Sequence, residues 1–194
     1  NLLVQQERGP PRSVAVSGGY STGQGIRLEG SFTHRNLFPP EGALIVTAVA
    51  GTQEQGATAT FRRSNAGRRD RTVTFTAGAD HSNYDAFDAF TTTFSGRISY
   101  DSTPIWQKKF TYAYGFELTG TNESVYDFGR GARRRATYFI AALPGQVEFD
   151  RSDSLLNPTK GYRLKLNLSP ETSVRCAVRP YARTLVEASG YYPI

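Results

Sequence analysis

The feature that most constrains this chain is a strict alternation of apolar and polar side chains over residues 25–34. The apolar side chains fall on one side of the run: Ile26, Leu28 and Phe32. Arg27 and Glu29 fall on the other side. Because successive side chains of a strand point to opposite faces, this pattern predicts a β-strand. A tilted strand needs about 9–11 residues to cross a bilayer, so its apolar face is long enough to contact either a protein core or lipid.

The same alternation returns along most of the chain and predicts about ten strands, with no helix. Residues 110–118 and 162–168 show it clearly, and Gly- or Pro-containing turns separate the runs. Residues 121–135 are basic and polar, which predicts a long loop. Residues 137–150 are predicted to form one strand with a bulge or bend at Pro144-Gly145.

Composition bears on whether the strands form a membrane barrel or a soluble fold. Hydrophobic residues make up 38% of the 194 residues and the mean hydropathy is −0.45. No apolar run is long enough for a transmembrane helix, which needs about 18 residues, but barrel strands alternate and keep their mean hydropathy low. Several runs exceed the 5–6 residues that are common in soluble strands. A transmembrane barrel is therefore favoured, with a soluble β-sandwich or jelly roll as the alternative.

In a barrel, the two faces of each strand meet different solvents. The apolar faces are predicted to contact lipid through Ile26, Leu28, Phe32, Phe110, Tyr112, Tyr114, Phe116, Leu164 and Leu166. The opposite faces are predicted to line a water-filled lumen through Arg27, Glu29, Arg97, Glu117, Arg163 and Lys165.

The net charge of +6 and the isoelectric point near 9.6 raise the question of nucleic-acid binding. The arginines mostly alternate with apolar residues along strands or sit in turns, and no aromatic RNA-binding motif, zinc spacing or recognition helix occurs. Nucleic acid is therefore not an expected partner. The single Cys176 cannot form an internal disulfide.

The sequence predicts no catalytic, cofactor or metal site, and the protein is expected not to be an enzyme. His34 and His81 are expected to be ordinary surface histidines, because neither has further ligands at useful spacing. The triplet Asp80-His81-Ser82 has the composition of a catalytic triad, but triads assemble from distant positions. The acidic residues Asp150 and Asp153 are expected to belong to a solvated turn.

Three motifs carry a family resemblance. They are Gly19-Tyr20-Ser21-Thr22-Gly23, His34-Arg35-Asn36-Leu37-Phe38 and Asn157-Pro158-Thr159-Lys160-Gly161. In this order they resemble the opening hairpin, the end of the second strand and a periplasmic turn in the barrel of the bacterial surface-antigen family, which includes BamA, TamA and FhaC. The likeness is closest to TamA. Complete barrels of the family have about sixteen strands, and neither the lumen-loop motif VRGF nor an aromatic closing strand is found here.

The resemblance implies an all-β, antiparallel up-and-down transmembrane β-barrel, of which residues 13–194 are the N-terminal portion. Residues 1–12 would be the linker from a preceding periplasmic POTRA domain. The implied location is the outer membrane of a Gram-negative bacterium. The implied partners are outer-membrane lipid, client β-barrel or secreted proteins, the protein's own POTRA domains and a periplasmic or inner-membrane partner.

The resemblance also implies a function, the insertion or export of outer-membrane and secreted β-proteins such as autotransporters. The first strand is the expected lateral gate, comprising Ser13, Val14, Ala15, Val16, Ser17, Gly18, Gly19 and Tyr20. It would offer its unpaired backbone to an incoming strand, because strand edges are templates for pairing. The alternatives are a two-partner secretion transporter, a diffusion porin and, as a further class, a soluble β-sandwich binding module.

Overall fold

The computed structural model describes residues 9–22, 25–38, 41–84, 87–103, 106–127, 129, 131–175 and 177–193, and every regular element in this part is a strand. The strands are β1 (Arg12–Ser21), β2 (Gly25–Phe38), β3 (Gly42–Gly51), β4 (Glu54–Arg63), β5 (Arg71–Asn83), β6 (Phe87–Tyr100), β7 (Phe110–Asp127), β8 (Ala132–Ala142), β9 (Gly145–Asp150), β10 (Gly161–Val174) and β11 (Val178–Tyr191). No helix in the described part could cross a membrane. The all-β prediction is confirmed.

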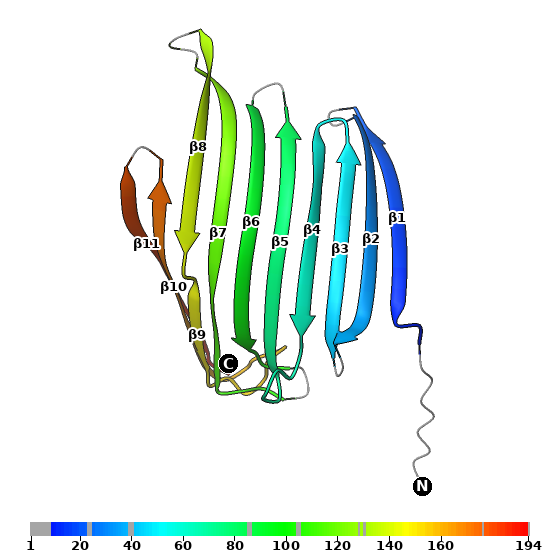
Figure 1. Cartoon of the computed structure of the whole chain (residues 1–194). Helices are drawn as coiled ribbons and strands as arrows, with labels where there is room; N and C mark the ends of the chain where they lie inside the picture. The colour runs from blue at the N-terminus through cyan, green and yellow to red at the C-terminus, as the bar shows by residue number, and fades with distance from the viewer. Residues whose placement is uncertain are drawn as a thin grey trace.

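All strands belong to one antiparallel sheet in which sequence neighbours pair, from β1 at one edge to β11 at the other (Figure 1). The exception is β9, which pairs with β7 and β10. β8 lies between the same two strands. β8 and β9 therefore follow each other along one line, and the meander has ten strand positions for its eleven strands.

The predicted bulge at Pro144-Gly145 is absent. Glu117 pairs with Ala142 and Tyr114 pairs with Gly145, so the register against β7 is the same on both sides of the gap. The Gly115 amide still donates to the Pro144 carbonyl oxygen at 2.9 Å. Because proline has no N–H, the ladder misses a donor there without gaining an extra residue.

The predicted loop over residues 121–135 is wrong, because most of this segment forms the outer part of the β7–β8 hairpin. Pairing continues to Asp127 and Ala132, and the hairpin extends beyond its neighbours at the upper end of the sheet (Figure 1). Charged side chains do not by themselves end a strand when the backbone groups are paired. Arg133, Arg134 and Arg135 therefore lie on a strand.

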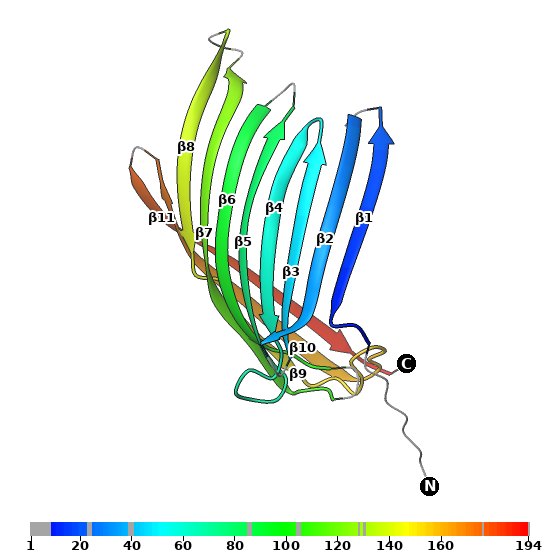
Figure 2. The ribbon, with the colours of Figure 1, turned by 45° about the vertical axis from the view of Figure 1, so that its right-hand side comes forward.

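The sheet curves and its strands bow along their length (Figure 2). Directly paired residues point to the same side, so the register assigns each side chain to a face. One row of paired residues crosses seven strands and holds Phe32, Val46, Ala59, Ala77, Phe94, Leu118 and Ala141. We call the side bearing this row the apolar face, and the side bearing Arg27 and Glu29 the polar face.

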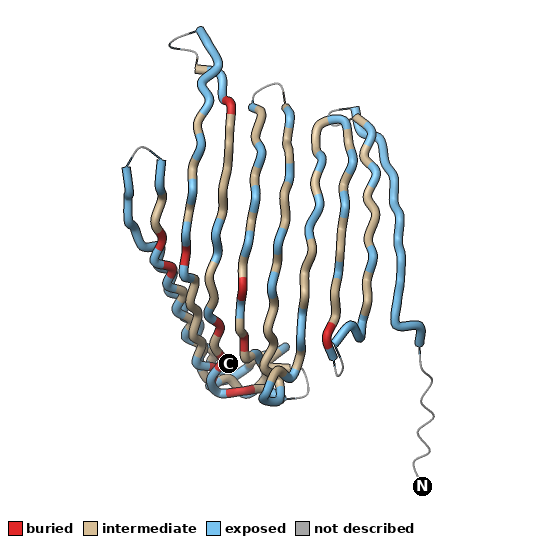
Figure 3. The backbone as a smooth tube through the Cα atoms, viewed as in Figure 1, coloured by how far each residue is buried: buried red, intermediate tan, exposed pale blue. Residues whose placement is uncertain are grey.

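The sheet has no second layer and almost no core. Ala113 and Ala142 are the only buried hydrophobic residues in the described part of the chain, and no large side chain there is fully buried. Most strand positions are exposed or half-buried (Figure 3). A soluble sandwich would bury one face of each of two sheets against the other. The single sheet therefore excludes the sandwich alternative.

Candidate functional site

The first candidate site is the open edge formed by β1. Among the described residues β1 pairs only with β2, so the backbone groups on its other side have no strand partner. All ten of its residues are exposed, and Val14, Val16 and Tyr20 are 72%, 78% and 74% exposed. The strand begins at Arg12, so the predicted gate residues 13–20 lie within it. Residues 1–8 of the predicted linker lie outside the described residues.

β1 is attached to β2 through ten paired residues and by no side-chain ion pair among the described residues. In the described part of the chain no β1 side chain makes a hydrogen bond or an ion pair. The polar-face side chains of β1 are Ser13, Ala15, Ser17, Gly19 and Ser21, all too short to reach far. The next strand, β2, differs. Its Arg27 forms an ion pair with Glu54 of β4 at 2.5 Å and another with Glu29 of β2 at 3.4 Å.

The opposite edge is fastened differently. β11 pairs with β10 along 14 residues. Two ion pairs cross these strands on the polar face: Lys165–Glu187 at 3.1 Å and Arg183–Glu171 at 2.6 Å. The Glu171 side chain is only 6% exposed. Side-chain charges therefore reinforce the backbone ladder of β11.

The register gathers the six residues predicted to face a lumen on the polar face: Arg27, Glu29, Arg97, Glu117, Arg163 and Lys165. It gathers the nine predicted lipid-facing residues on the apolar face: Ile26, Leu28, Phe32, Phe110, Tyr112, Tyr114, Phe116, Leu164 and Leu166. Aromatic rings touch across strands on the apolar face, with centroids 5.5 Å apart for Phe94–Phe116 and 5.0 Å for Phe110–Phe149. Contact of the apolar face with lipid and of the polar face with a lumen stays a prediction.

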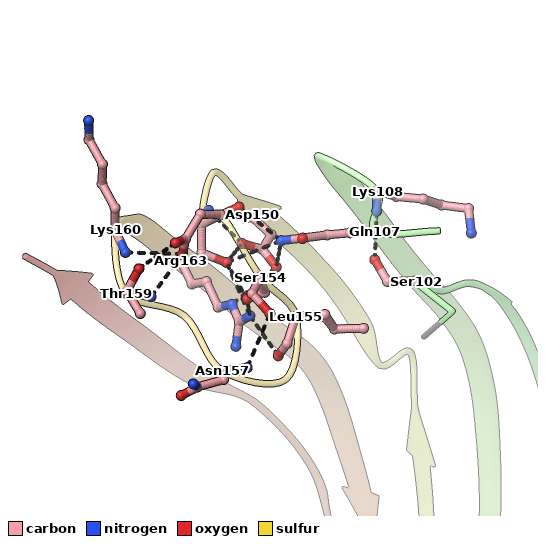
Figure 4. A network of polar contacts seen from close by, with 12 residues as sticks. Ser102, Gln107, Lys108, Asp150, Ser154, Leu155, Asn157, Thr159, Lys160 and Arg163 are labelled. Atoms are coloured by element: carbon pink, nitrogen blue, oxygen red, sulfur yellow. Dashed lines mark hydrogen bonds and ion pairs between the residues drawn. The ribbon is translucent and has the colours of Figure 1, made fainter. Parts of the chain in front are cut away.

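A polar cluster secures the loop that leads into β10 (Figure 4). Asp150 is 4% exposed and accepts from Arg163 Nε and Gln107 Nε2, each at 3.0 Å. It also accepts from the Ser152 amide at 2.9 Å and the Ser152 hydroxyl at 2.6 Å. The carboxylate at the end of β9 thus holds three segments: the start of β10, the loop between β9 and β10, and the segment before β7.

Arg163 completes this cluster, since its Nη2 donates to the carbonyl oxygens of Ser154 at 2.7 Å and Leu155 at 2.8 Å (Figure 4). The loop ends at Gly161, whose φ is +106°. A Cβ at that position would collide with the Arg151 carbonyl oxygen. Arg163 lies on the polar face as the alternation predicts, but its guanidinium donates hydrogen bonds to the loop before β10. No local pattern indicates Gln107, because its partner Asp150 is distant in sequence.

Asp153 holds the same loop from within. It accepts from the Thr159 hydroxyl at 2.5 Å and from the Thr159 and Lys160 amides at 2.8 and 3.0 Å. The Thr159 hydroxyl and these amides lower the pKa of Asp153 to about 2, because they stabilise the charged carboxylate. The predicted Asn157-Pro158-Thr159-Lys160-Gly161 turn is thus fastened by a carboxylate four residues before it.

Lys108 ties two further loops together at the same end of the sheet. It is 6% exposed, and its ammonium lies 3.1 Å from Asp70 and 2.5 Å from the Asp101 carbonyl oxygen. It also lies 4.9 Å from the centre of the Tyr100 ring. A buried ammonium needs such partners. The contact links the β4–β5 loop to the β6–β7 connection, which sequence patterns do not reveal.

The histidines and carboxylates form no catalytic arrangement. Asp80 and Ser82 point to the polar face, whereas His81 points to the apolar face and lies 2.6 Å from Asp88. His34 departs from the expectation of an ordinary surface histidine, since its buried Nδ1 has no hydrogen-bond partner among the described residues. No group of three potential metal ligands occurs within the described residues.

Comparisons with known proteins agree with this architecture. Residues 9–194 match the Omp85 superfamily domain. The fold is similar to the crystal structure of BamA from Haemophilus ducreyi lacking POTRA domains 1–3, with a TM-score of 0.56 and 12% sequence identity. The match covers 93% of this chain and 42% of that chain, so the present chain spans less than half of the solved structure's length. No curated protein matches the chain in sequence.

Proposed function

The chain belongs to the Omp85 superfamily, and on this premise we propose that it is the N-terminal part of the barrel of a factor that assembles or translocates outer-membrane proteins. The complete protein would reside in the outer membrane of a Gram-negative bacterium and act without enzymatic chemistry. Residues 1–12 would connect it to its POTRA domains. The finer assignment, supported by the motifs in the sequence, is a TamA-like factor whose clients include autotransporters.

The observation that carries this proposal is the open edge of β1. An unpaired strand presents a row of N–H and C=O groups that another strand can add to. In hydrocarbon, each unsatisfied backbone group costs several kcal/mol. β1 must therefore pair with something in a membrane, and in the complete barrel that partner is the closing strand. An incoming client strand can replace the closing strand because it pairs with the same N–H and C=O groups on the free edge of β1.

A disulfide lock tests this mechanism. Ala15→Cys would be joined to a cysteine in the closing strand of the full-length protein, in a Cys176→Ser background. Locking should abolish client insertion into liposomes, and reduction of the disulfide should restore it. Unchanged insertion by the locked protein would overturn the lateral-gate mechanism.

The chain offers a matched control for this lock. Ala15 pairs with Ser31 of β2, so Ala15→Cys with Ser31→Cys would fasten β1 on its other side. That lock leaves the seam with the closing strand free. It should therefore preserve insertion, which separates closure of the seam from a general loss of flexibility in β1.

A further inference from the structure

The side chains of the apolar face change character toward the ends of β5 to β8 that lie at the top of Figure 1. One row of paired residues there is uncharged and holds one large apolar side chain: Ala79, Thr92, Gly120 and Phe139. The next row holds His81, Phe90, Asn122 and Thr137, and the row beyond it holds Asn83, Asp88, Ser124 and Arg135. The surface thus passes from apolar to polar within two residues of each strand. Such a step is what a boundary between hydrocarbon and lipid headgroups requires.

A hollow of about 540 Å³ lies at this step. Its lining combines the polar side chains Gln55, His81, Asp88, Asn122 and Arg135 with Gly56, Ala79 and Phe90. His81 Nε2 lies 2.6 Å from Asp88 Oδ1, so the carboxylate is already engaged. Asn122 Nδ2 donates to the Thr137 hydroxyl at 2.7 Å. Arg135 is exposed and has no ion-pair partner among the described residues. The hollow therefore presents one guanidinium that has no ion-pair partner among the described residues, next to an apolar surface.

An apolar groove of about 390 Å³ lies on the same strands below the step. Phe94, Leu118 and Phe139 form its walls, and Gly120 leaves room between them. A Cβ at Gly120 would lie 3.1 Å from the Thr92 hydroxyl and 3.4 Å from the Phe139 ring. Because residue 122 of the hollow and residue 120 of the groove are neighbours on one face of β7, the two depressions follow each other along the strand.

We propose that the hollow and the groove form one binding site for a phosphate-bearing lipid of the outer leaflet, of the lipid A class. Arg135 would hold the phosphate, since a guanidinium pairs with phosphate through two parallel hydrogen bonds. One acyl chain would lie in the groove between Phe94 and Phe139. A zwitterionic lipid carries its own ammonium beside the phosphate and gains less from an arginine, which favours the anionic class.

The choice of leaflet rests on the proposed function. The chain enters β1 at the lower end of the sheet, opposite the hollow (Figure 1). If POTRA domains precede β1 on the periplasmic side, the hollow lies at the outer surface. The outer leaflet is also where a single lipid can place several acyl chains against one barrel wall.

The test measures lipid A carried by the detergent-solubilised full-length protein, using native mass spectrometry. Arg135→Gln should lower lipid A occupancy about tenfold, because a charge-assisted contact is lost. Arg135→Lys should retain most of the binding. Ala141→Leu fills the groove without touching the headgroup hollow and should lower occupancy about threefold. Lipid A stripped of its phosphates should bind wild type and Arg135→Gln equally.

Arg63→Gln is the matched control. Arg63 is also an exposed arginine on the apolar face, but it lies at the end of β4 that is farther from the hollow. It should leave lipid A occupancy unchanged. Equal occupancy of wild type and Arg135→Gln, or an equal loss in Arg63→Gln, would overturn the site. Either result can coexist with a working β1 lock, so the lipid site can fail while the proposed function stands. If the protein instead runs as a compact monomer without detergent, both fail.

Discussion

The two edges of this sheet are both unpaired on one side, yet they are built differently. β1 has 10 residues, is exposed along its whole length and is paired with β2 without a side-chain ion pair among the described residues. β11 has 14 residues and is fastened to β10 by two ion pairs as well. An edge strand without cross-strand ion pairs depends on its backbone ladder, whereas β11 is also held by side-chain charges.

The strongest ion pair near this edge lies where β10 begins and joins β10 to β9. There Arg163 neutralises the nearly buried carboxylate of Asp150, whereas both side chains of the Lys165–Glu187 pair are more exposed. A buried charge that loses its partner costs far more than a lost surface pair. The stability of the sheet should therefore respond most to changes at the base of β10 and least to changes in exposed turns.

The largest effect is expected from Arg163→Gln in the full-length protein. Asp150 would keep its charge without its guanidinium partner, and we expect unfolding in denaturant to become easier by about 3 kcal/mol. Equilibrium unfolding by urea in detergent would measure this. Lys165→Gln removes a more exposed cation from the same strand and should cost about 1 kcal/mol or less. Equal losses in both variants would show that the base of β10 is no special anchor.

A smaller effect is expected when β1 receives a cross-strand ion pair of the kind that joins β11 to β10. Ser17 pairs with Glu29 on the polar face, so Ser17→Lys would add a cross-strand ion pair. Hydrogen exchange of the β1 amides should slow about threefold, whereas client insertion should stay unchanged, because the seam with the closing strand remains free. Ser13→Lys is the control, because its partner Thr33 carries no charge. Identical exchange in the two variants would argue that β1 mobility does not depend on side chains.

The smallest effect concerns the loop before β10 and depends on pH. The pKa of Asp153 is lowered from 3.8 to about 2. The stability that its carboxylate gives to the loop is therefore complete above its ordinary pKa. It is lost as the pH falls through the lowered value. The Thr159 and Lys160 amide signals should therefore shift in NMR spectra as the pH falls below about pH 3, with a midpoint near pH 2. Asp153→Asn should remove this dependence, and a titration that persists in the variant would assign it to another carboxylate.

The parts of the fold that could be predicted are those that depend on a two-residue period. Alternation alone predicts the strands and sorts residues such as Phe116 and Glu117 to opposite faces, because adjacent side chains of any strand must diverge. The same rule explains why Asp80 and His81 cannot act together.

The errors have two physical causes. A high density of charged and polar residues predicts a loop over residues 121–135, but paired backbone groups tolerate charged side chains on an exposed strand. The contacts of Asp150 with Gln107 and of Lys108 with Asp70 join segments far apart in sequence. Which distant loops meet is decided by the order and register of the strands, and single-sequence patterns do not contain that information.

The gap between β8 and β9 bears on the dimensions of any barrel built from this sheet. The ladder loses the Pro144 donor, but the strand keeps its alignment with β7 and with β10 on both sides of the gap. In a closed barrel the radius and the strand tilt follow from the number of strands and their total stagger, the shear. The missing donor adds nothing to the shear. The wall can therefore be weakened locally at Leu143-Pro144 while the bore of the barrel stays the same.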